Sequence, residues 1–180
     1  MTAVEPPRRV ATSTGSGRSS EDPIVRPAAR VLLLDTSDRL LLLRVIVDPD
    51  DARPLWITPG GGVEVGETHP QAARRELREE LNLDDVELSR CVWTREHPWH
   101  WIARDQWIRT TERFYVARLA EDAPDLTLYP DGMLEMNDLR WWTVEEIATA
   151  EEEIAPRRLA TLLPPIIAGE LPDPPIDAGV

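Results

Sequence analysis

Cysteine is nearly absent from this chain of 180 residues, which contains Cys91 alone. A single thiol excludes a disulfide framework and a cysteine-rich metal site. Its strand-like surroundings favour a buried, unreactive side chain. No apolar run is long enough to span a membrane. Arg8 and Arg9 precede a polar segment, not the apolar stretch of an export signal. We therefore expect a cytoplasmic protein that does not bind membranes.

Lysine is absent altogether, so all 20 basic residues are arginine, and 33 acidic residues give a net charge of −13. Such an acidic chain lacks the basic surface that a phosphate backbone requires, so no nucleic-acid polymer is expected as a partner. Solubility is a sufficient explanation of the charge. A hydrophobic content of 42% over this length can form one full core, which favours a single domain.

The most informative stretch, residues 61–83, reads GGVEVGETHPQAARRELREELNL. Its glycine-rich start predicts a turn, and its second half predicts a short helix. Thr68 and Gln71 form a capping-box pattern, and Pro70 suits the first turn of a helix. Asn82 is a suitable left-handed residue at the other end.

Three carboxylates gather on one side of this predicted helix. At about 100° per residue, Glu76 and Glu80 lie about 40° apart, and Glu79 lies about 60° beyond Glu76. Carboxylates this close repel one another unless a cation or a proton offsets their charge. Oxygen ligands suit Mg²⁺, with Mn²⁺ as a substitute. The apolar row expected to face the core is Ala73, Leu77 and Leu81, and the opposite flank carries Arg74, Arg75 and Arg78.

A charged surface helix with stabilising Glu–Arg pairs would also explain the run RRELREEL. The preceding glycine turn favours a functional interpretation. The whole stretch resembles the signature of the Nudix hydrolases: Gly, five residues, Glu, seven residues, then Arg-Glu-apolar-x-Glu-Glu-x-Gly-apolar. The single departure is Asn82 in place of glycine, which we expect to cost stability and not activity. Eight of the nine constrained positions match, namely Gly61, Glu67, Arg75, Glu76, Leu77, Glu79, Glu80 and Leu83.

This resemblance implies Mg²⁺-dependent hydrolysis of a diphosphate linkage in a nucleotide derivative such as ADP-ribose or an oxidised nucleoside triphosphate. We interpret Glu76 and Glu80 as metal ligands, because they share one face one turn apart. Glu79 is a candidate ligand of a second ion or a general base. By family analogy, the backbone carbonyl of Gly60 is a further ligand. An ion pair between Arg75 and Glu67 is expected to orient the turn without taking part in the chemistry.

Three residues outside this stretch are further candidates. Glu112 is a candidate base or metal ligand on a predicted strand, and a cross-strand pair with an arginine explains it equally well. Arg44 is a candidate for binding a terminal phosphate, although a solvated arginine is the commoner case. Trp99 is a candidate for stacking on a base or nicotinamide, and packing within a hairpin is the alternative.

Strand-like runs on both sides of the helix predict an α/β fold with a mixed sheet between helices. The Nudix resemblance likewise implies an α/β/α sandwich with a catalytic loop-helix-loop. We expect a disordered tail over residues 1–26, the Nudix domain over 27–163 and a loosely ordered proline-rich tail over 164–180. The predicted strands are Ala29–Leu34, Leu40–Val47, Leu55–Thr58, Val86–Glu96, Ile108–Arg118 and Leu139–Thr143. A capping box of Thr143 and Glu146 opens a short helix, and a helix over Arg157–Leu163 is expected to end at Pro164.

Two other functions occur on this type of fold. A non-catalytic nucleotide-sensing module is disfavoured, because such modules usually lose box glutamates that are all present here. An isoprenoid diphosphate isomerase relies on a reactive cysteine in a setting that Cys91 does not resemble. The expected partner is therefore a small nucleotide substrate, and a homodimer is a further option.

Overall fold

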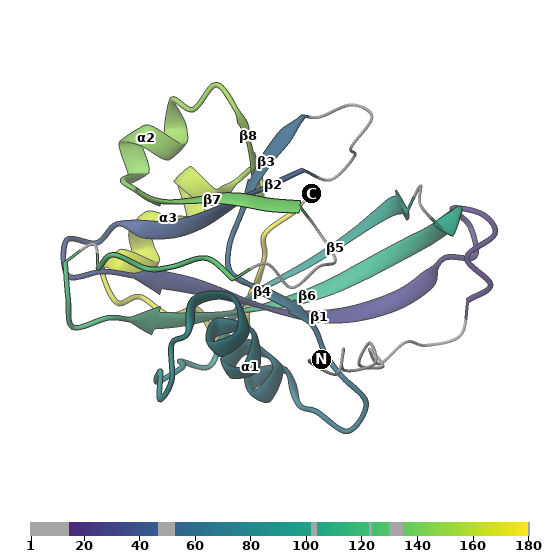
Figure 1. The fold of residues 1–180 in the computed structure, drawn as a ribbon, viewed down its shortest axis with the longest axis horizontal. Helices are drawn as coiled ribbons and strands as arrows, with labels where there is room; N and C mark the ends of the chain where they lie inside the picture. The colour runs from purple at the N-terminus through teal and green to yellow at the C-terminus, as the bar shows by residue number, and fades with distance from the viewer. Residues whose placement is uncertain (1–14, 47–52, 102–103, 123, 130–134, 180) are drawn as a thin grey trace, which may run out of the picture.

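A mixed β-sheet forms the centre of the molecule, and helices cover both of its faces (Figure 1). This computed structural model describes residues 15–46, 53–101, 104–122, 124–129 and 135–179. The strands are β1 (Ile24–Leu34), β2 (Leu40–Ile46), β3 (Pro54–Ile57), β4 (Gly60–Gly62), β5 (Cys91–Trp101), β6 (Gln106–Arg118), β7 (Glu135–Trp142), β8 (Glu153–Ala155) and β9 (Ile176–Asp177). The helices are α1 (His69–Leu81), α2 (Val144–Ala148) and α3 (Leu159–Ile167).

The sheet has the order β8-β3-β2-β1-β6-β5-β9, with β4 beside β1 and β7 beside β2. β1 and β6 run parallel along the full length of β1, from Ile24 opposite Ile108 to Leu34 opposite Arg118. β5 and β6 form an antiparallel hairpin that extends beyond the helices, at the right of Figure 1. On the other edge of β1, the glycine strand β4 enters the sheet. The turn before α1 is therefore fixed directly to the central strand.

Both faces of β1 and β2 are buried, which explains their nearly continuous apolar sequences. On β1, Val31 and Leu33 belong to the core on the α1 side, together with Leu77 of α1. Leu32 belongs to the core on the other side, together with Leu163 of α3. The predicted α/β/α arrangement is confirmed.

The ends of α1 agree with the sequence pattern. The backbone N–H of Thr68 donates to Gln71 Oε1 at 2.8 Å, as in a capping box. At the other end, Asn82 adopts a left-handed conformation with φ of 53°, and its N–H donates to the carbonyl of Arg78 at 3.0 Å. The predicted apolar row of Ala73, Leu77 and Leu81 is buried in the core.

The expected end of the last helix at Pro164 is wrong, because α3 continues through Pro164 and Pro165 to Ile167. Each proline removes an intrahelical donor, but both are exposed while Leu163 and Ile166 are buried. Burial of this apolar row outweighs the two lost hydrogen bonds.

Residues beyond α3 also contribute to the sheet instead of forming a loose tail. β9 pairs with β5, and the N–H of Ala178 donates to the carbonyl of Thr94 at 2.8 Å. At the other terminus, β1 already begins at Ile24. The disorder expected of residues 1–14 falls outside the described residues, as does the predicted strand end at Val47. Among the residues described, no helix has the length and apolar character to cross a membrane.

Candidate active site

The glycine turn brings the sheet and α1 into close contact. Gly60 pairs with Arg30 of β1, and its φ of 128° is a conformation that other residues rarely adopt. A Cβ atom at Gly60 would lie 2.2 Å from the carbonyl oxygen of Ala29. A Cβ atom at Gly61 would lie 2.5 Å from Oε1 of Glu76. The Gly60 position therefore requires glycine, because its neighbours are backbone atoms. At Gly61 a Cβ atom would displace the end of the Glu76 side chain, so this position places a carboxylate of α1 against the turn.

The three box glutamates occupy different environments. Glu80 is 3% exposed, and its Oε2 accepts from the Gly60 N–H at 2.9 Å. Glu76 is 4% exposed, and its Oε1 accepts from Arg75 Nη1 at 2.7 Å. The side chain of Glu79 is 34% exposed and accepts from the same nitrogen at 3.0 Å. Glu76 and Glu80 thus form the inner pair, and Glu79 has access to solvent.

Arg75 connects the turn to the helix. Its Nε and Nη2 donate to the two carboxylate oxygens of Glu67, each at 3.0 Å, so the predicted ion pair is present. Nη2 also donates to the carbonyl of Gly62 at 2.8 Å. Burial alone would lower the pKa of Arg75, but its bonds to Glu67 and Glu76 raise that pKa above the usual value. The guanidinium is permanently charged.

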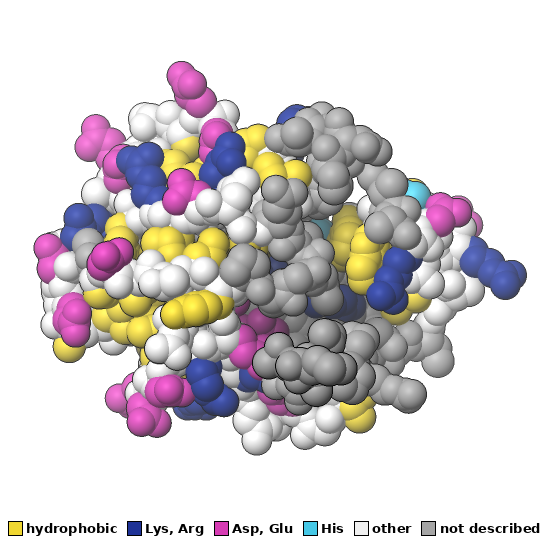
Figure 2. All heavy atoms as spheres, viewed as in Figure 1, with side chains coloured by type: hydrophobic (Ala, Val, Ile, Leu, Met, Phe, Trp, Pro, Cys, Tyr) yellow, Lys and Arg dark blue, Asp and Glu magenta, His cyan; other side chains and the backbone are white. Residues whose placement is uncertain are grey.

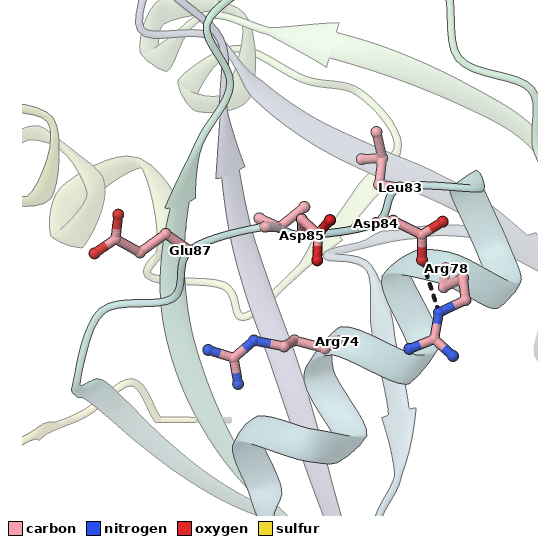
Figure 3. A pocket seen from close by; sticks show the side chains of 7 residues that line it. Arg74, Arg78, Leu83, Asp84, Asp85 and Glu87 are labelled. Atoms are coloured by element: carbon pink, nitrogen blue, oxygen red, sulfur yellow. Dashed lines mark hydrogen bonds and ion pairs between the residues drawn. The ribbon is translucent and has the colours of Figure 1, made fainter.

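One expectation about this helix is wrong, because Arg75 does not lie on the flank opposite the glutamates. It contacts Glu76 and Glu79 directly, since a long side chain reaches its neighbour one turn along the helix. Arg74 and Arg78 do lie on a separate side, where they line a cavity of about 320 Å³ with the segment after the helix (Figure 3). In this cavity, Arg78 Nε donates to Asp84 Oδ1 at 2.9 Å.

A buried ion cluster lies next to the glycine turn on the sheet. Glu112 of β6 is 2% exposed and accepts from Arg30 Nε at 2.8 Å and from Arg95 Nη1 at 3.1 Å. Arg30 Nη1 also donates to the carbonyl of Gly60 at 2.7 Å. Sequence reasoning missed Arg30, although a charged residue within the apolar run AARVLLL was a usable signal.

Charge and burial determine the protonation of this cluster. Burial alone would raise the pKa of Glu112, but Arg30 and Arg95 hold it below its usual value. Burial lowers the pKa of His97 to about 4, and Arg95 contributes to this decrease. At neutral pH the cluster therefore contains two arginines, one carboxylate and a neutral imidazole. The cross-strand pairing considered for Glu112 is present, while its role as a base stays a prediction.

The structure does not bring Arg44 to the glutamates. Arg44 lies on the sheet face opposite α1 and binds Glu152 with both Nε and Nη2 at 3.1 Å. Trp99 lies on the β5–β6 hairpin, and its Nε1 donates to Thr110 Oγ1 at 2.9 Å. Side chains alternate between the two faces of a strand, so Arg95, His97 and Trp99 lie on the same face of β5. Trp99 therefore lies on the same face as Glu112 and Arg95. Alternation places Arg44 on that face as well, but its guanidinium is bonded to Glu152 and not to the ion cluster.

Cys91 is half-buried, and burial raises the pKa of its thiol. This environment does not activate a nucleophile. Across the described part of the chain, no three acidic, histidine or cysteine side chains converge closely enough to form a metal centre in their present positions.

Comparisons with known proteins agree with this geometry. A family model described as NUDIX domain matches residues 25–163. An RNA pyrophosphohydrolase of Cellvibrio japonicus (strain Ueda107) is 30% identical over 124 residues, which cover 64% of this chain and 71% of the relative. A dihydroneopterin triphosphate diphosphatase of Escherichia coli (strain K12) is 41% identical over 63 residues, which cover 34% of this chain and 39% of the relative.

Solved structures show the same fold. The MutT protein from Methanosarcina mazei Go1 superposes with a TM-score of 0.59 at 18% identity, over 84% of this chain and 98% of that chain. The dihydroneopterin triphosphate pyrophosphohydrolase of E. coli gives a TM-score of 0.53 at 24% identity, over 70% of this chain and 86% of that one. Because the family model spans most of the chain, this protein belongs to the Nudix hydrolases, which hydrolyse pyrophosphate bonds.

Proposed function

We propose that this protein is a Mg²⁺-dependent hydrolase that cleaves a diphosphate linkage in a small nucleotide derivative. One observation carries the proposal. Glu76 and Glu80 are both nearly inaccessible and both lie against the glycine turn. Burial of two carboxylates side by side is costly unless positive charge compensates them. Arg75 supplies part of that charge to Glu76, and a divalent cation bound between the carboxylates and a phosphate would supply more.

The donor set fits a hard divalent cation. Glu76, Glu80 and the carbonyl of Gly60 offer oxygen atoms alone, which suit Mg²⁺ or Mn²⁺. Glu76 is bonded to Arg75 in the structure, so metal ligation requires a change in the position of its carboxylate. When bound, the cation neutralises phosphate charge and lowers the pKa of a water ligand.

The remaining side chains position these groups. Arg75 and Glu67 hold the glycine turn against α1, so the position of the turn relative to the box glutamates is fixed. Glu79, the most accessible of the three glutamates, is the candidate for accepting a proton from the attacking water. Glu112 is occupied by two arginines, and its lowered pKa makes it a weak base.

The substrate is proposed to be a mononucleotide derivative and not a polymer. Relatives bear the names RNA pyrophosphohydrolase and dihydroneopterin triphosphate diphosphatase, so one name refers to RNA and the other to a pterin triphosphate. The net charge of −13 disfavours a polyanionic partner. ADP-ribose and oxidised nucleoside triphosphates remain candidates within this class.

A substrate panel tests the proposal. The purified protein is incubated with Mg²⁺ and nucleoside triphosphates, oxidised nucleoside triphosphates, ADP-ribose and a 5′-triphosphorylated RNA, and the products are identified by chromatography. We expect a nucleoside monophosphate, pyrophosphate or phosphate from at least one mononucleotide. Metal-dependent binding with no product from any compound would favour the nucleotide-sensing alternative.

A further inference from the structure

We propose that the β5–β6 hairpin binds the ring end of a nucleoside oligophosphate, with the base stacked on Trp99 and a phosphate oxygen bound to Arg95. This inference rests on the proposed function, because it specifies the substrate of the same site. Figure 2 shows hydrophobic, basic and acidic side chains near a histidine over this hairpin. The groups that carry the inference are the indole of Trp99 and the guanidinium of Arg95.

Arg95 has a hydrogen-bond donor that a phosphate oxygen can satisfy. Arg95 Nε is buried and, among the residues described, has no hydrogen-bond partner. Its Nη1 is bonded to Glu112, which holds the guanidinium in place. A buried N–H without an acceptor is costly, and a phosphate oxygen is the acceptor that a guanidinium binds best. Nδ1 of His97, the next residue on this face, is also buried, lies 3.9 Å from Glu112 Oε2 and makes no hydrogen bond within the described part of the chain.

A continuous series of contacts connects Arg95 to the box glutamates. Glu80 accepts from the N–H of Gly60, and the carbonyl of Gly60 accepts from Arg30. Arg30 and Arg95 then share Glu112. The charges of Glu80 and Glu76 also act on the pKa of Arg30. A phosphate bound at Arg95 would therefore be linked to the proposed metal ligands through Glu112, Arg30 and Gly60.

Trp99 offers a base an aromatic surface in a fixed orientation. The bond from Trp99 Nε1 to Thr110 Oγ1 satisfies the indole N–H and fixes the ring orientation. Trp101 lies beside it, with ring centroids 5.9 Å apart and planes inclined by 34°. Arg104 lies over Trp101, with its Cζ 4.5 Å from the ring centroid. Trp101 and Arg104 thus support Trp99, whose half-buried ring is available to a ligand.

The spacing between the two ends matches a nucleotide. Arg95 and Trp99 are four residues apart on one strand, which corresponds to about 13 Å. A ribose with an extended oligophosphate is of this order, so one molecule spans both residues. Trp99 is not needed to fill the core at this end of the molecule. Trp93 and Phe114 do so further along the hairpin, with ring centroids 5.8 Å apart.

Calorimetric titration with ATP, GTP and inorganic tripolyphosphate tests this arrangement, with Ca²⁺ in place of Mg²⁺ to limit turnover. Trp99→Leu is the test variant. Trp107→Leu is the matched control, because Trp107 is on the same hairpin but on the opposite face, where it packs against His100 at 5.1 Å. Melting curves establish that both variants fold.

We expect Trp99→Leu to weaken ATP and GTP binding by about 5-fold to 100-fold, the range for one stacked base. Tripolyphosphate binding should not change in this variant, and Trp107→Leu should bind all three compounds as the wild type does. Arg95→Lys, which keeps the charge beside Glu112, should weaken ATP and tripolyphosphate alike.

Equal losses in Trp99→Leu and Trp107→Leu, or no binding of either nucleotide to the wild type, would overturn the inference. The titration reads binding and not turnover. A protein that binds ATP through Trp99 but hydrolyses no substrate would therefore refute the proposed function and leave this assignment intact.

Discussion

Replacing Glu112 with glutamine tests whether the buried ion cluster is chiefly structural. The Glu112 side chain is 1% exposed, and the side chains of Arg30 and Arg95 are 13% and 11% exposed. Glutamine retains the shape of the side chain but removes its charge. Its amide oxygen can accept from one arginine, while its NH₂ group then faces the other. Two buried guanidinium groups would lose their shared counter-ion.

The size of this effect follows from the burial of all three groups. Removing one partner of a buried ion pair costs about 3–5 kcal/mol, from a total stability of about 5–15 kcal/mol for a domain. At about 2–4 °C per kcal/mol for a chain of this length, the melting temperature should decrease by about 6–20 °C. Calorimetric melting measures this decrease, with Glu170→Gln as an exposed control on the C-terminal side of α3. A loss below about 1 kcal/mol would refute the structural role.

The pH dependence provides a second readout of the same cluster. The pKa of Glu112 is lowered from 4.5, so its contribution to stability is present above pH 4.5 and is lost as the pH falls through the lower, folded value. The pKa of His97 falls from 6.5 to about 4, so the unfolded chain binds the extra proton between these values. Stability should therefore already decrease between pH 6.5 and pH 4. Urea unfolding at several pH values measures both effects, and Glu112→Gln should lose the part below pH 4.5.

Three further substitutions test the proposed centre. Glu80→Gln retains an acceptor for the Gly60 N–H but removes the charge, so turnover in Mg²⁺ should fall about 100-fold or more while the melting temperature changes little; turnover near the wild-type level would contradict the ligand assignment. Gly61→Ala forces a Cβ atom to within 2.5 Å of Glu76 Oε1, so we expect a loss of about 1–3 kcal/mol in urea unfolding and lower turnover. Arg75→Lys cannot form the two-point contact with Glu67, and steady-state assays should show about 10-fold to 100-fold lower turnover; unchanged kinetics would exclude Arg75 as a positioning residue.

The glycine turn and α1 could be predicted from the sequence because their constraints are local. A capping box, a left-handed asparagine and a four-residue apolar repeat are each set by neighbouring residues. The contact between Arg75 and Glu67 was predicted for the same reason. Both residues lie within one short segment with fixed geometry at each end.

The ion cluster could not be predicted because it depends on strand pairing. Arg30 and Glu112 are 82 residues apart and meet through the parallel pairing of β1 with β6. Nothing in a local pattern determines that register. The extension of α3 through Pro164 has a similar origin, since the buried face of the helix, and not its own propensity, determines its length. The binding of a phosphate by Arg44 stays a prediction, and its contact with Glu152, 108 residues along the chain, could not be read from a local pattern.

The absence of lysine acquires a physical meaning once these contacts are known. Arg30, Arg75 and Arg95 have side chains only 11–13% exposed, and each lies between carboxylates or carbonyls around the proposed site. A buried lysine readily loses its proton, whereas a guanidinium stays charged and donates in several directions at once. An acidic protein can therefore present permanent positive charge to an anionic substrate by burying arginines beside its carboxylates. The net charge of the chain, with most acids on the surface, then does not describe the local charge at the site.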